Sequence, residues 1–313
     1  MSVLVVVKQT IQTMRSKEMN NVVGFSRFNM NNDIFKIKGS VVDFPMREEN
    51  LPFFWDKKVI YRVNEEEDII KGLGIVGHNY PLNTHVDFFS AQHDMLQRKF
   101  PAAHLENVST KYRTSRDGAW ALQDIRFPNV KHLIDNGKHT TELALRFASW
   151  HSVDGSVRNN AVFGTMDFFC TNLDMSGEYS LIQKKNTKNF DMKEFIDEIE
   201  KSVEDFYLTG RKYQAWANRD ISIDNAKCVI ESLPLAVSDR KKKGLLDLYK
   251  QEAIDRGHTV WALYSAFTNY SSHTNNGFGV KLTRNDHEAK TMIDRQFEVA
   301  KWVATEEFVR LAA

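Results

Sequence analysis

Two Asp-Gly pairs, Asp117-Gly118 and Asp154-Gly155, constrain the fold of this chain more than any other feature of its sequence. Aspartate caps its own backbone and glycine adopts positive φ at little steric cost, so each pair favours a tight turn. Alternating side chains flank the first pair at 108–115 and 120–127, and apolar runs flank the second. Because tight turns join antiparallel neighbours, the sequence predicts two β-hairpins within a mainly antiparallel sheet.

The spacing of apolar residues changes from that of a strand to that of a helix near residue 191. One apolar stripe recurs at steps of three and four residues and is expected to end at Gly210; its members are Phe195, Ile199, Val203 and Phe206. Further helices are expected at 222–232, 238–256, 258–272 and 286–311. Within the third of these, three aromatic residues predict a buried stripe that fastens the helices to the sheet: Trp261, Tyr264 and Phe267.

Strands first and helices afterwards indicate an α+β fold. We expect a mainly antiparallel β-sheet with one early helix, which begins near Thr84, followed by a helical C-terminal half packed on the sheet. Three regions follow from this pattern: a variable N-terminal lead-in at 1–56, a β-rich core domain at 57–189 and a helical C-terminal region at 190–313.

Composition limits the class of protein. The 313 residues are 42% hydrophobic and 27% charged, which is ordinary for a globular protein with a sizeable core. The net charge of +1 excludes a strongly basic protein, so a nucleic-acid site would have to be a local patch. The `VLVVV` run at 3–7 predicts a strand, and with no apolar run near the length of about 20 residues that spans a bilayer, no membrane partner is expected. The two cysteines form no metal or redox spacing and indicate a reducing compartment.

Three segments together resemble a known family. They are `GLGIVGHNYPLNTHVDFF` at 72–89, `SWHSVDGSVRNNAVFGTMDFFCTN` at 149–172 and `TVWALYSAFTNYSSH` at 259–273, and the similarity extends over about 57–275. In order and spacing they resemble the phage- and plasmid-borne group known only as domain of unknown function 932. The resemblance implies a phage-type protein in the cytoplasm of the host bacterium. It also marks a structural motif made of His151, Asp154, Gly155, Cys170 and Asn172.

The pattern Gly72-x-Gly74-x-x-Gly77 matches the dinucleotide-binding motif in its letters alone. That motif has to lie between a strand and a helix whose N-terminus holds pyrophosphate. Here Ile75 and Val76 continue a strand through the pattern, and Pro81 delays the helix. We therefore expect the glycines to serve strand geometry and expect no cofactor.

The ten histidines invite a metal site, but none of them forms the His-Glu-x-x-His helix pattern, so no metal is expected. His151 and Asp154 flank a turn, where they would cap backbone amides, or else His151 would act as a general base. Cys170, at the end of an aromatic strand, is typical of a small buried hydrophobe. The sequence contains no nucleophile elbow, phosphate loop or paired catalytic carboxylates and does not favour an enzyme.

Cations near hairpin ends are the remaining candidate chemistry. Such side chains follow a phosphate backbone while neighbouring rings stack on bases, or they form a solvated sheet edge; both interpretations stay open. The candidate nucleic-acid-binding residues are Lys111, Tyr112, Arg113, Arg116, Arg158, Lys184, Lys185 and Lys188. All of these except Tyr112 and Arg158 are expected to form one phosphate-contacting strip.

The expected function is that of a phage-type nucleic-acid-binding protein, with single-stranded DNA binding or annealing during replication or recombination as its specific form. One alternative is a non-enzymatic phage factor that binds a host or phage protein. Another is an enzyme acting on nucleotides or nucleic acid. The expected partners are single-stranded nucleic acid, further copies of the chain in a homo-oligomer, or a phage or host protein.

Overall fold

The structure is a computed structural model that describes residues 34–167, 173–174, 181–273 and 288–313. Three sequence-based expectations fall outside the described residues: the strand at 3–7, Cys170 and Asn172. The strands and first helices are β1 (Met46–Leu51), β2 (Phe54–Val63), β3 (Ile69–Gly77), α2 (His85–Lys99), α3 (Ala102–Leu105), β4 (Ser109–Ser115), β5 (Trp120–Asp135), β6 (Thr140–Ser152), β7 (Asn159–Asp167), β8 (Leu173–Asp174) and β9 (Ile182–Lys184). The later helices are α4 (Met192–Lys201), α5 (Val203–Ala217), α6 (Ile223–Glu231), α7 (Asp239–Arg256), α8 (Val260–Ser272), α9 (Glu288–Val303) and α10 (Glu306–Ala312).

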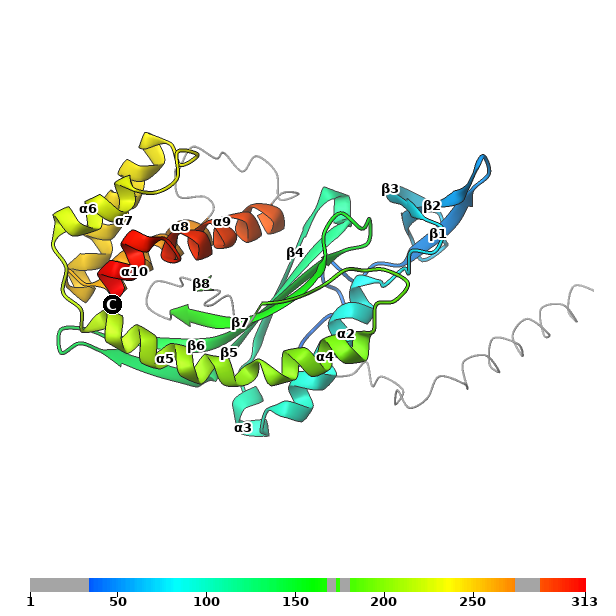
Figure 1. The fold of residues 1–313 in the computed structure, drawn as a ribbon. Helices are drawn as coiled ribbons and strands as arrows, with labels where there is room; N and C mark the ends of the chain where they lie inside the picture. The colour runs from blue at the N-terminus through cyan, green and yellow to red at the C-terminus, as the bar shows by residue number, and fades with distance from the viewer. Residues whose placement is uncertain (1–33, 168–172, 175–180, 274–287) are drawn as a thin grey trace, which may run out of the picture. The chain divides into compact units, whose positions relative to one another are not determined.

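The larger sheet runs in the order β4-β5-β6-β7-β8, with β9 also paired to β7, and all of its pairings are antiparallel (Figure 1). The first Asp-Gly pair lies in a short 3-10 turn between β4 and β5, where Gly118 has a φ of 101°. The second joins β6 to β7, and Gly155 has a φ of 71°. Both hairpins are therefore confirmed. A third turn, at Asn136-Gly137, joins β5 to β6, and the Asn136 side chain accepts backbone hydrogen bonds from Lys138 and His139.

A smaller antiparallel sheet has the order β1-β2-β3. It packs through Ile60, Leu73 and Val76 against Trp120 and Val153, which flank the two Asp-Gly turns. Strand β1 and the start of β2 lie inside the segment expected as a lead-in, so part of that segment belongs to this sheet.

Helices cover both faces of the larger sheet. Successive side chains of a strand point to opposite faces, and here both faces carry apolar residues. On one face lie α2 and α4 (Figure 1). Phe88 and Phe89 of α2 and Phe195 of α4 pack there against Ile125 and Phe147. The α2 helix begins where expected, because the Thr84 hydroxyl accepts a hydrogen bond from the Asp87 amide.

On the other face, Met292 and Ile293 of α9 pack against Leu122 and Trp150. The remaining helices build a second core around α8, in which Trp261, Tyr264 and Phe267 are all buried together with Ile134 and Leu143 of the sheet. The expected α+β fold with a helical C-terminal half is thus confirmed. None of the helices in the described parts of the chain combines the length and the apolar character that a membrane span requires.

Two helix ends differ from expectation. Gly210 does not end a helix but lies inside α5, and the break comes earlier, at Ser202 between α4 and α5. A Cβ atom at position 210 would lie 2.8 Å from the His132 ring, so the glycine permits close packing of α5 on β5. The last expected helix is divided into α9 and α10, and Thr305 precedes the second.

Candidate functional site

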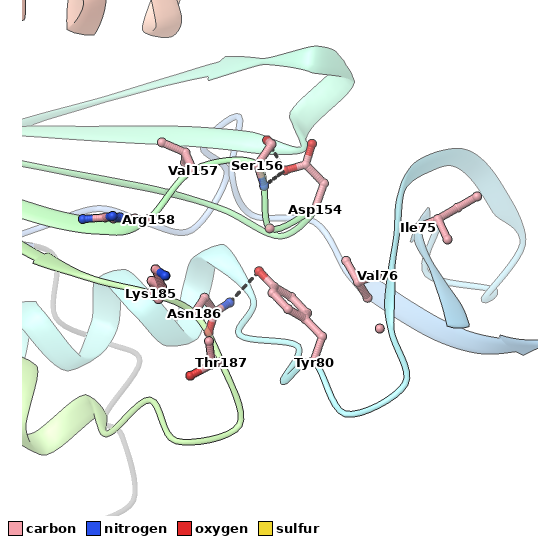
Figure 2. A pocket seen from close by; sticks show the side chains of 12 residues that line it. Ile75, Val76, Tyr80, Asp154, Ser156, Val157, Arg158, Lys185, Asn186 and Thr187 are labelled. Atoms are coloured by element: carbon pink, nitrogen blue, oxygen red, sulfur yellow. Dashed lines mark hydrogen bonds between the residues drawn. The ribbon is translucent and has the colours of Figure 1, made fainter. Parts of the chain in front are cut away.

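A pocket of about 480 Å³ lies where three segments of the chain meet (Figure 2). They are the end of β3 with the following Tyr80, the β6–β7 turn at 154–158, and the loop at 185–187 after β9. The first two belong to the segments that resemble the known family, although they stand about 80 positions apart in the chain. Concave sites of this volume accept a small molecule or one unit of a polymer.

Tyr80 forms the wall of the pocket and is held from two sides. Its hydroxyl donates a hydrogen bond to the Ser152 carbonyl at 3.2 Å. It also accepts one from Asn186 Nδ2 at 2.7 Å (Figure 2). Asn186 accepts in turn from Asn83 Nδ2 at 2.8 Å. Burial, only partly offset by the Asn186 hydrogen bond, raises the pKa of Tyr80 to about 12. The phenol is therefore neutral at physiological pH, and its two hydrogen bonds hold the ring in place as the wall of the pocket.

Asp154 holds the β6–β7 turn, and its charge is balanced by an ion pair. Its carboxylate accepts a hydrogen bond from the Ser156 amide at 3.0 Å and forms an ion pair with Arg116 at 3.0 Å. The Ser156 hydroxyl accepts from Trp120 Nε1 at 2.7 Å. Asp154 therefore caps the turn, in the structural role expected from its sequence position.

Gly74 brings β3 against this turn. A Cβ atom at position 74 would lie 2.5 Å from the Cβ of Asp154 and 3.1 Å from its Cα, far inside van der Waals contact. At Gly72, by contrast, an added Cβ would meet nothing within 4 Å. The second glycine of the pattern thus serves close approach of two backbones, as expected for strand geometry.

We expect Gly74→Ala to lower the free energy of unfolding by about 1–3 kcal/mol, because β3 has to move away from Asp154. Gly72→Ala is the matched control and is expected to leave stability unchanged or raise it by a few tenths of a kcal/mol, since alanine restricts the unfolded chain. Urea unfolding of both variants measures the difference. Equal stability of the two would show that β3 does not depend on this contact.

Arg158 and Lys185 give the pocket its charge. Both are exposed and line it, and in the view of Figure 2 they lie on the opposite side of the Tyr80 ring from Ile75 and Val76. The Arg158 backbone is held because its carbonyl accepts a hydrogen bond from Asn160 Nδ2. With the Asp154 carboxylate engaged by Arg116, the pocket presents two cations to a ligand.

The other candidate residues are dispersed. Lys111 is exposed on β4, and on the same sheet face Arg113 forms an ion pair with Asp124 at 3.6 Å. The Tyr112 hydroxyl points into the opposite layer, where its single hydrogen can be donated to either the Phe35 carbonyl oxygen at 3.3 Å or Gln123 Oε1 at 3.2 Å. Because β4 and β9 lie on opposite sides of β5, β6 and β7, the structure does not bring the six cations into one strip.

The cations after β7 also have different surroundings. Lys184 forms ion pairs with Glu194 at 3.1 Å and Glu198 at 2.6 Å, and therefore fastens β9 to α4. Lys188 is exposed three residues beyond Lys185. Only Arg158 and Lys185 of the predicted set line the pocket, and the structure adds Tyr80 and Asn186, which sequence reasoning missed. The sequence did offer a signal for Tyr80, because this residue lies in the 72–89 segment that resembles the known family.

His151 does not cap the turn but lies in the buried layer between α2 and the sheet. Its Nε2 is 2.8 Å from Nδ1 of His85, whose Nε2 is 2.7 Å from the Gly118 carbonyl oxygen. Both rings are fully buried, and desolvation lowers the pKa of His85 to about 4 and holds the pKa of His151 well below its usual value. Both imidazoles are therefore neutral at physiological pH.

Among the described residues, no group of histidine, cysteine or acidic side chains could hold a metal ion.

The family model described as "Domain of unknown function (DUF932)" matches residues 72–299, and the chain therefore belongs to this family. The matched region contains every segment that lines the pocket. Neither a curated protein nor a solved structure gives a significant match to the chain.

Proposed function

We propose that the chain binds single-stranded nucleic acid at the pocket between β3, the β6–β7 turn and the loop after β9. The observation that carries the proposal is the grouping of Arg158 and Lys185 beside the Tyr80 ring in a concave site. Arginine and lysine bind phosphate oxygens, and an aromatic or apolar wall packs against an unstacked base.

A single strand suits this pocket better than a duplex. The pocket has room for one nucleotide, whereas the bases of a duplex remain stacked and paired inside the helix. A site made of two cations also agrees with the near-neutral charge of the whole chain, because a local patch is enough for a single-stranded ligand.

The biological setting extends the proposal. The resemblance to phage- and plasmid-borne proteins supports a role in phage replication or recombination, in the cytoplasm of the host bacterium. Annealing requires several chains on one strand, so a homo-oligomer that lines up successive pockets is the form we propose for that activity.

Binding of labelled oligonucleotides at several salt concentrations tests the function. The logarithm of the affinity for a single strand should fall linearly with the logarithm of salt concentration, with a slope of about −0.7 for each phosphate contact. We expect Arg158→Ala/Lys185→Ala to weaken binding by about tenfold or more and to flatten the slope by about 1.4. Fluorescence anisotropy with single- and double-stranded oligonucleotides measures both quantities.

The matched control is Arg211→Ala/Lys250→Ala, which removes the same two charges from exposed positions on α5 and α7. This variant should keep the wild-type slope and affinity. A protein that binds no nucleic acid at low salt, or a pocket variant with an unchanged slope, would contradict the proposal.

A second candidate function, binding of a host or phage protein, is favoured by the tip of the β1–β2 hairpin. Phe53 and Trp55 are 92% and 90% exposed there, and Phe54 is 60% exposed. Adjacent exposed aromatics are typical of protein-binding surfaces. The nearby Glu48, Glu49 and Asp56 are ion-paired with Lys58, Arg47 and Lys57, so these six residues leave no excess positive charge for phosphate. If the chain binds no nucleic acid, this surface becomes the leading candidate.

A further inference from the structure

Two buried polar side chains next in sequence to residues that line or brace the pocket have atoms for which the described part of the chain offers no hydrogen-bond partner. Asn159, at the start of β7, is 0% exposed, and neither its Nδ2 nor its Oδ1 has a hydrogen-bond partner among the described residues. His151, near the end of β6, is also 0% exposed, and its Nδ1 has no hydrogen-bond partner within the same residues. Buried polar groups in folded proteins are almost always paired, so three such atoms need an explanation.

The hydrogen-bond chain fixes what His151 can do. The Gly118 carbonyl only accepts, so His85 Nε2 has to carry a hydrogen. Since His85 is neutral, its Nδ1 is then bare and accepts from His151 Nε2. His151, neutral as well, is left with a bare Nδ1 that can only accept a hydrogen bond.

Register places the two side chains on the same face of the sheet. The β6–β7 pairing ends at Trp150 and Asn160, so His151 and Asn159 are the next residues of the two strands, and by alternation both face the side that α2 covers. We call His151 and Asn159 the polar pair.

The polar pair adjoins, in sequence or in strand pairing, residues that line or brace the pocket. Arg158 immediately precedes Asn159, and Asn159 pairs with Lys184, whose neighbour is Lys185. The carbonyl of Ser152, the residue after His151, accepts a hydrogen bond from the Tyr80 hydroxyl. Tyr80, which Asn186 holds, is the pocket residue whose hydroxyl contacts the end of β6 at Ser152, so displacement of its ring is the route by which a base would reach the polar pair.

We propose that the polar pair recognises a nucleobase that carries an exocyclic amino group beside a ring nitrogen acceptor, as adenine and cytosine do. This inference rests on the proposed function. An asparagine amide can donate to the ring nitrogen through Nδ2 and accept one amino hydrogen through Oδ1, and the bare Nδ1 of His151 takes the second amino hydrogen. Thymine lacks the amino group and leaves these acceptors unpaired.

The test compares single-stranded homo-oligomers of adenine, cytosine and thymine of equal length. We expect the wild-type chain to bind the first two about tenfold more tightly than the third, which is the effect of one well-formed base contact. Asn159→Leu replaces the amide with an apolar group of similar size. It should abolish the preference by weakening adenine and cytosine binding to the thymine level, and it should raise the melting temperature, because a buried unpaired amide is lost.

The two readouts separate recognition from a purely structural role. If Asn159→Leu does not fold, Asn159→Ser, which is smaller, should still lose the preference. Equal affinity of the wild type for all three homo-oligomers, or a preference that survives in both variants, would overturn the inference while leaving single-strand binding in place. Absence of binding to all three would remove the proposed function and, with it, this role of the polar pair.

Discussion

Replacing Asp124 with Asn is expected to lower the free energy of unfolding by about 3–5 kcal/mol, because the change leaves buried cations without their carboxylate. Asp124 and Arg146 are both 0% exposed, and Oδ1 of Asp124 accepts from Arg146 Nε at 2.6 Å. Arg113 and Arg126 approach Oδ2 at 3.6 and 3.4 Å, with 15% and 16% of their side chains exposed. One carboxylate therefore holds guanidinium groups from β4, β5 and β6 together.

The same network predicts how stability depends on pH. Burial acts to raise the pKa of Asp124, but Arg146, Arg126 and Arg113 outweigh it and hold the pKa below the usual 3.8. The carboxylate's contribution to stability is therefore complete above the unfolded-state pKa and is lost as the pH falls through the lower folded-state pKa.

Urea unfolding at neutral and acid pH measures both effects. The control Asp56→Asn removes an exposed carboxylate 3.6 Å from Lys57 and should change stability by well under 1 kcal/mol. Asp124→Asn should also lose less stability than the wild type as the pH falls, because it lacks this buried carboxylate. A variant as stable as the control would mean that the three arginines do not depend on Asp124.

The second large effect concerns Trp261, whose replacement by Ala should lower the free energy of unfolding by about 3–5 kcal/mol. Its side chain is 4% exposed and packs against Tyr213, with ring centroids 4.9 Å apart, and against Tyr264 at 5.7 Å. The cavity left by the indole cannot close, because α5 and α8 are fixed by the other aromatic residues of this core.

Trp55→Ala is the matched control, since this indole is 90% exposed and its loss should cost little stability. Thermal or urea unfolding compares the two variants, and nucleic-acid binding is measured in parallel. Unchanged stability of Trp261→Ala with a loss of binding would assign Trp261 to a base-stacking surface instead of the core.

The local elements of the fold were predictable because their signals lie within a few residues. The Asp-Gly turns, the Thr84 cap and the α6, α7 and α8 helices follow from neighbouring side chains that satisfy or restrict the nearby backbone. Gly210 shows where such signals fail. A glycine suggests a helix end, but here the close approach of His132, 78 positions earlier in the chain, explains it.

The candidate site was predictable only in part. Its cations Arg158 and Lys185 and its turn residues Asp154 and Gly155 were identified from sequence, whereas the dispersal of the other cations was not. A strand pattern shows which residues alternate, but it does not show on which side of a sheet two hairpins lie or which face an adjacent helix covers. Those depend on strand order, which is fixed by packing between layers.

By itself, the sequence determined the antiparallel hairpins, the helical period after residue 191 and the family to which the chain belongs. Tertiary structure alone decided that Gly74 meets Asp154, that Asn186 holds Tyr80, and that Arg158 and Lys185 line one pocket. The physical reason is one of range. Turns and helices are set by interactions over a few residues, whereas the pocket is made by contacts between segments up to about 100 positions apart, whose encounter depends on the register and packing of the whole sheet.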